Sequence, residues 1–88
     1  MRIKPEFSID YEMDDISIVR TEPDGTVRAV SPISASAALA WEGFQKGLPR
    51  EAIVESVVQE FAGASEEVVA QELEELARQL VALGYAEE

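Results

Sequence analysis

The spacing of apolar residues changes once along the chain, at Ser31 and Pro32. Before this point, apolar side chains fall at every second position over residues 3–13, which is the period of a strand with one covered face. After it they recur every three or four positions, which is the period of a helix with one buried stripe. The pattern therefore predicts strands followed by helices, an α+β domain.

The first part of the chain predicts a small antiparallel sheet. Its strands are expected at residues 7–12, 16–21 and 26–30. Pro23, Asp24 and Gly25 lie between the last two strands; proline presets the first turn position, and glycine accepts the left-handed conformation that a short hairpin needs. The second and third strands are therefore expected to form a hairpin in a three-stranded sheet.

The second part predicts a three-helix bundle packed on the sheet, in a winged-helix-like arrangement. Its helices are expected at residues 34–46, 49–61 and 65–83. Ser34 and Ser65 are suited to cap helix N-termini, and Gly84 is suited to end the last helix. Two apolar stripes are assigned to the core: Ile33, Ala37, Ala40, Trp41 and Phe44 on the first helix, and Val69, Leu73, Leu76, Leu80 and Leu83 on the third.

The size of the chain limits it to one hydrophobic core. It has 88 residues, no cysteine and no linker-like segment, so we expect one domain over residues 1–88, held by packing alone. No apolar run is long enough for a membrane span, and the first residues do not resemble a secretion signal. The expected location is the cytoplasm.

The charged residues argue against several classes of function. Eighteen acidic and seven basic residues give a net charge of −11, which repels nucleic-acid phosphates. Without histidine or cysteine the chain lacks the usual groups for proton transfer, nucleophilic attack and transition-metal binding. Its carboxylates scatter around the predicted helices instead of converging on one point. We therefore expect no catalysis, no metal and no cofactor.

The start of the first predicted helix resembles the signature of the PqqD-like proteins. The residues that carry the resemblance are Ile33, Ser34, Ala35, Ser36, Ala37, Ala38, Leu39, Ala40, Trp41 and Glu42. The spacing of Ile53, Phe61, Leu73, Leu76 and Leu80, with the closing Leu83, Gly84 and Tyr85, is similar to the rest of that pattern. Serine stands at 34 and 36 where the family usually has asparagine and threonine, and both serines keep the small hydroxyl.

The resemblance implies a peptide-binding adaptor. Members of this family recognise the leader segment of a ribosomally made precursor peptide and present it to a modifying enzyme, such as a radical S-adenosylmethionine maturase, or to a leader protease. The leader adds as a strand to the third strand and lies against the third helix, a mode that any free sheet edge allows. On the third strand the residues expected to bind the leader are Thr26, Val27, Arg28 and Ala29.

On the third helix, one flank of the core stripe is expected to form the other wall of the groove. This flank consists of Ala70, Glu74, Ala77 and Val81. The two alanines would let a peptide backbone come close, although alanine is also simply a good helix former. Arg20 and Arg28 could pair with acidic leader residues, or could be ordinary solvated strand residues.

Two other classes of function fit the expected architecture. A winged-helix DNA-binding regulator has the same elements, but here the third helix carries five glutamates and a single basic residue, Arg78. A structural module for dimerisation or for scaffolding another protein is also compatible with the sequence.

Overall fold

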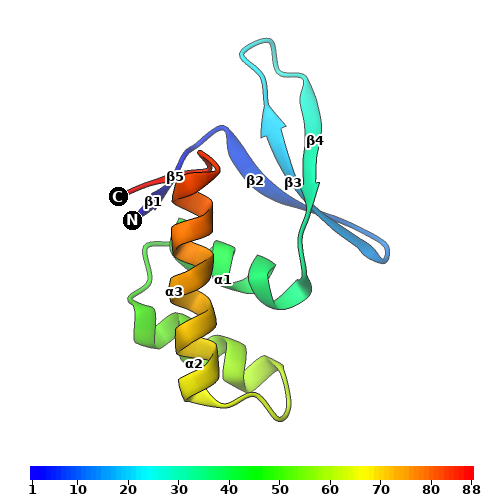
Figure 1. Ribbon diagram of the computed structural model, residues 1–88. Helices are drawn as coiled ribbons and strands as arrows, with labels where there is room; N and C mark the ends of the chain where they lie inside the picture. Colours follow the sequence, from blue (N-terminus) through cyan, green and yellow to red (C-terminus); the bar gives the residue numbers. More distant parts are fainter.

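The computed structural model describes all residues, 1–88, and confirms an α+β fold in which a three-stranded antiparallel sheet precedes three helices (Figure 1). The strands are β1 Arg2–Ile3, β2 Phe7–Glu12, β3 Asp15–Thr21, β4 Val27–Pro32 and β5 Ala86–Glu87, and the helices are α1 Ala35–Gln45, α2 Arg50–Glu60 and α3 Glu66–Ala82. None of the helices combines the length and the apolar character that crossing a membrane requires.

The sheet has the strand order β2-β3-β4, so β2 and β4 are its two edges. Gly25 has φ of 90°, as the predicted hairpin between β3 and β4 requires. The register of β3 against β4 shifts between Ile18 and Val19, which makes a β-bulge. β4 continues past the expected end at residue 30 and reaches Pro32.

The predicted helix caps are present. The hydroxyl of Ser34 accepts a hydrogen bond from the Ala37 N–H, and the hydroxyl of Ser65 accepts one from the Val68 N–H. After α3, Gly84 has φ of 85°, the left-handed conformation that ends many helices.

The core lies between the helices and the inner face of the sheet. Trp41 is completely buried, which confirms its place in the core. The Phe7 ring of β2 meets the Tyr85 ring edge-on at 5.0 Å between centroids, so the sheet is attached to the helices by aromatic packing. Leu83, by contrast, is 67% exposed, so its expected place in the core is wrong: the helix has already ended at Ala82 and the chain turns away.

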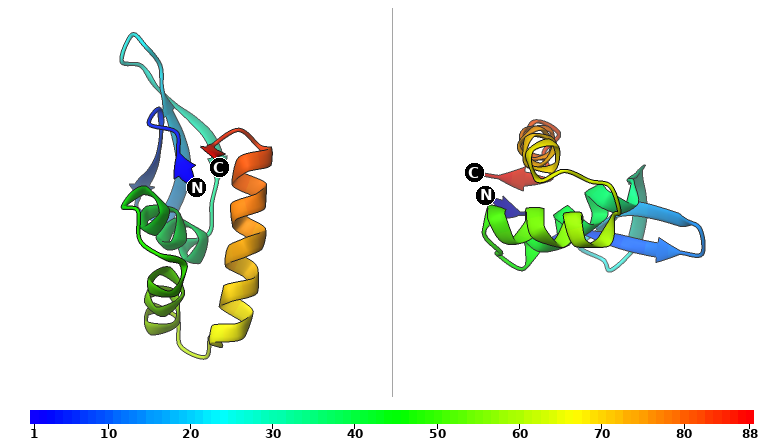
Figure 2. Two further views of the ribbon diagram at one scale, coloured as in Figure 1. Left: turned by 90° about the vertical axis from the view of Figure 1, so that its left-hand side faces the viewer. Right: turned by 90° about the horizontal axis from the view of Figure 1, so that it is seen from below.

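The two ends of the chain pair with each other, which the sequence did not suggest. β1 and β5 form a two-stranded antiparallel sheet with Arg2 opposite Glu87 and Ile3 opposite Ala86. Figure 2 shows the two termini side by side at the end of α3, away from the projecting β3–β4 hairpin. Ile3 and Ala86 are both buried, so this small sheet closes one side of the core.

Candidate functional site

The outer edge of β4 is the most open stretch of regular backbone in the molecule. No strand pairs with it on that side, and Ser31 is its only half-buried residue, the other five being exposed. Val27 is 61% exposed and Val30 is 43% exposed. A strand edge with exposed apolar side chains is the usual template for an added strand.

The hydrogen bonds at the ends of the hairpin show which backbone groups of β4 face outward. The Glu22 N–H donates to the Thr26 carbonyl at 2.8 Å, so residues 22 and 26 face each other across the ladder. Bonded and non-bonded pairs alternate in an antiparallel ladder, which makes Arg28 a bonded partner of β3 and leaves the N–H and C=O groups of Val27 and Ala29 pointing outward. These groups are available to a neighbouring strand. We call this side of β4 the open edge.

Pro32 fits the end of the open edge for the same reason. The Ile33 N–H donates to the Ile16 carbonyl at 3.1 Å, so the next pair inward, Ser17 and Pro32, is non-bonded. Proline lacks an N–H, and at this position the missing donor would have pointed away from β3. The strand therefore tolerates Pro32 without losing a ladder hydrogen bond.

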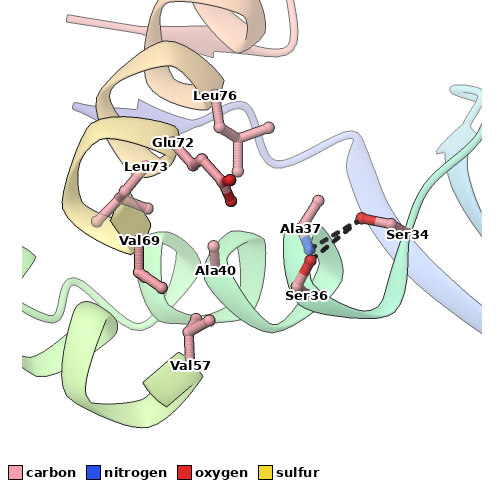
Figure 3. Close-up of a pocket in the computed structure, with 9 residues that line it drawn as sticks. All are labelled: Ser34, Ser36, Ala37, Ala40, Val57, Val69, Glu72, Leu73 and Leu76. Carbon is pink, nitrogen blue, oxygen red and sulfur yellow. Dashed lines mark hydrogen bonds between the residues drawn. The ribbon is translucent and has the colours of Figure 1, made fainter. Parts of the chain in front are cut away.

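A hollow of about 160 Å³ lies where β4 passes into α1. Its lining residues come from the start of α1, from α2 and from one side of α3: Ser34, Ser36, Ala37, Ala40, Val57, Val69, Glu72, Leu73 and Leu76. Figure 3 shows Leu76 and Glu72 pointing from α3 toward the first turn of α1, where the Ser34 hydroxyl caps the helix. We call this hollow the α1–α3 pocket. The pocket begins close to the end of β4 along the chain, because Ser34, which lines it, follows Pro32 after a single residue.

The wall that α3 contributes to this pocket is not the flank expected from the sequence. Val69, Glu72, Leu73 and Leu76 line the α1–α3 pocket, and none of them belongs to the expected set. Ala70 and Glu74 instead line a different hollow, between α2 and α3. Glu74 also accepts a hydrogen bond from Arg50 Nε of α2 at 2.8 Å. These two residues therefore do not line the α1–α3 pocket.

The other two residues of the expected flank belong to the core. Ala77 is only 6% exposed and lies in the main apolar cluster, and Val81 is a half-buried residue packed against that cluster. Ala77 is therefore not an open groove wall. An arginine at position 77 is expected to unfold the domain, because it would bury an unpaired charge in a packed core.

The four residues expected on the third strand lie close together, but they differ in role. Thr26 is in the turn before β4: its N–H binds Asp24 Oδ1 at 2.9 Å, and its carbonyl accepts from Glu22. These hydrogen bonds from Thr26, mainly from its backbone, lower the pKa of the Asp24 carboxyl. Val27 and Ala29 offer outward backbone groups, whereas Arg28 offers its side chain. Thr26 therefore shapes the hairpin and has no free backbone group for an added strand.

Two apolar residues at the site lie outside the set expected to bind the leader: Val30, which is exposed on β4, and Leu76, which lines the α1–α3 pocket. Leu76 had been assigned to the core stripe with Leu83, although it is only half-buried and borders the α1–α3 pocket. The signal that could have found Leu76 is the breadth of the apolar stripe of α3, which is wider than one core contact requires. No group of three or more acidic residues is placed to hold a metal ion.

Comparisons with known proteins add one result. No protein-family model and no curated protein matches the chain. Among solved structures, the chain is similar to TbiB1 in complex with the TbiA(beta) leader peptide, with a TM-score of 0.66 and 21% sequence identity over 99% of this chain and 100% of that one. At this identity the likeness concerns the fold. This chain therefore has the fold of TbiB1, a protein whose structure was solved with a leader peptide bound.

Proposed function

We propose that this protein is a non-catalytic adaptor that binds the leader segment of a ribosomally made precursor peptide. The leader adds as a strand to the open edge of β4, and an apolar leader side chain enters the α1–α3 pocket. The adaptor then presents the precursor to a modifying enzyme, such as a radical S-adenosylmethionine maturase, or to a leader protease.

The observation that carries the proposal is that two features lie close together along the chain. The open edge supplies unpaired backbone groups, which give a bound strand affinity without regard to its sequence. The α1–α3 pocket, which begins close to the end of that edge along the chain, is lined mainly by apolar residues and can select one side chain. The shared fold with TbiB1 supports this use of the site, since that protein was solved with a leader peptide.

The test is a titration of the isotope-labelled protein with a synthetic peptide that carries the leader segment of its precursor. Amide chemical shifts are expected to change along residues 27–34 and along the α3 residues that line the pocket. Changes confined to α2 and the β1–β5 pair would contradict the proposal.

A matched pair of proline variants makes the test specific to one sheet edge. Ala29→Pro removes an outward N–H of β4 and leaves the ladder to β3 intact, so we expect a folded protein with binding weakened at least about tenfold. Tyr11→Pro makes the equivalent change on β2, the opposite edge, and should leave leader affinity unchanged. Equal losses in both variants would show that the leader does not use the open edge.

The pocket is tested by Leu76→Asp. This change places a charge beside the apolar lining while Leu73 and Leu80 keep the buried stripe of α3. Binding is expected to fall by at least about tenfold, because the carboxylate would be desolvated by an apolar leader side chain. Val68→Asp, on an exposed part of the same helix, is the control and should bind normally.

A further inference from the structure

We propose that the strand bound at the open edge carries a carboxylate side chain placed against Arg28. This inference rests on the proposed function, and it names one specificity-determining residue of the site. Arg28 would select for aspartate or glutamate at a single position of the leader.

The position of Arg28 in the sheet is the first observation. Phe7, Arg20 and Arg28 form one row across the three strands, because Phe7 is opposite Arg20 and Arg20 is opposite Arg28. Side chains directly opposite each other lie on the same face, so the two arginines are neighbours. Like charges in this arrangement destabilise a sheet, and here Arg20 lies on the central strand β3 while Arg28 lies on the edge strand β4.

The second observation is that the two arginines differ in their partners. Arg20 lies over the Phe7 ring at 5.8 Å from its centroid, and its Nε is 3.6 Å from Glu22 Oε1. Arg28 has neither an ion pair nor a side-chain hydrogen bond. The other arginines all pair with a glutamate: Arg2 with Glu87, Arg20 with Glu22, Arg50 with Glu74 and Arg78 with Glu75. In a chain of net charge −11, Arg28 is thus the one arginine without an anionic partner.

The third observation is the hydrogen-bonding pattern of β4, which decides how an added strand would meet Arg28. Because the backbone of Arg28 is bonded to β3, an antiparallel strand on the outer side would meet Arg28 as a non-bonded pair. Side chains approach more closely in such pairs than in bonded ones. A carboxylate at the facing position would therefore complete the row after Arg28, and it would relieve the repulsion between the two arginines.

The rest of the molecule sharpens this preference. The many glutamates of α3 repel acidic peptides in general, so a leader with several carboxylates is disfavoured. For a single carboxylate opposite Arg28, the direct ion pair offsets this repulsion. The site therefore favours a leader with one acidic residue opposite Arg28 and disfavours a leader with many acidic residues.

The test uses random peptides displayed on phage, since it does not depend on knowing the natural leader. Peptides of about twelve residues are long enough to follow the six residues of β4 and reach the pocket at about 3.3 Å per residue. We collect the peptides that bind the full-length protein but bind its Ala29→Pro variant more weakly. We expect them to share one aspartate or glutamate at a fixed distance from an apolar anchor.

Three variants decide the assignment. Selection on Arg28→Glu should replace the acidic position by lysine or arginine, Arg28→Lys should retain it, and Arg2→Glu, with the same change in net charge at the β1–β5 pair, should also retain it. In calorimetry, the best peptide should bind Arg28→Glu about five- to tenfold more weakly, with recovery when its carboxylate is changed to lysine. An acidic preference that survives Arg28→Glu, or no fixed acidic position, would overturn the inference. If no peptide depends on Ala29, the proposed function itself fails.

Discussion

The two edges of the sheet differ in how their outward backbone groups are satisfied. On β2, the outward groups of Phe7 are both occupied: its N–H donates to the Lys4 carbonyl at 3.1 Å, and its C=O accepts from Gln45 Nε2 of α1 at 3.1 Å. On β4, the outward groups of Val27 and Ala29 have no partner within the chain. The Phe7 end of β2 is thus closed by the fold, whereas the outward groups of Val27 and Ala29 on β4 are left for a partner.

The side chains reinforce this difference. β2 carries the exposed acidic residues Asp10 and Glu12, and charges on an edge strand discourage pairing with other chains. β4 carries no acidic residue and exposes Val27 and Val30. Natural proteins normally protect such an edge, so its lack of protection in this chain indicates a function.

The largest expected effect is a difference in unfolding free energy between variants of the two edge strands. Phe7→Ala should cost about 3–5 kcal/mol of unfolding free energy, because it removes a buried ring that packs on Tyr85. Val27→Ala on the opposite edge should change stability by no more than about 0.5 kcal/mol, since that side chain is mostly exposed. Urea unfolding of both variants measures the contrast. Similar losses would show that β4 is as firmly packed as β2 and is not a free edge.

The features of the fold that could be predicted from the sequence are those set by residues close to each other along the chain. Ser34, Ser65 and Gly84 act within one helical turn of their own positions, so sequence is sufficient to place them. The pairing of β1 with β5 could not be seen in this way. Each strand is only two residues long, too short for a periodic pattern, and they are separated by almost the whole chain.

The side of α3 that lines the α1–α3 pocket could not be predicted for a different reason. The apolar stripe of α3 has two flanks, one with Glu72 and one with Ala70 and Glu74, and the pattern gives no means of deciding which flank faces the start of α1. That choice depends on how three helices pack in space. The third strand has only one free edge, so the expected residues Val27, Arg28 and Ala29 lie on that edge without any such choice, while Thr26 lies in the turn before it.

A smaller effect is expected from opening the closed end of β2 at Phe7. Gln45→Ala removes the donor to the Phe7 carbonyl and leaves that acceptor unpaired at a partly buried position. We expect a loss of about 0.5–1.5 kcal/mol in unfolding free energy and no change in leader affinity. Gln59→Ala, which removes an exposed side-chain contact with Glu55 on α2, is the control and should cost less than about 0.5 kcal/mol. A Gln45→Ala variant as stable as this control would mean that the bond does not protect the β2 edge.

The smallest expected effect is a pH-dependent one at the other end of β2, at Tyr11. The Tyr11 hydroxyl of β2 donates a hydrogen bond to Glu42 of α1, and this bond raises the pKa of Tyr11 to about 12, with desolvation and the Glu42 charge adding to it. Because the folded-state pKa lies above the ordinary value of 10.0, the stabilisation is complete below pH 10 and is lost as the pH rises toward about 12. Its size should stay below about 1 kcal/mol, since the pair is exposed to water. Glu42→Gln should move one tyrosine titration, followed by tyrosinate absorbance, to lower pH. An unchanged titration would show that α1 does not hold the outer end of β2, and the difference between the two edges would then rest on Phe7 alone.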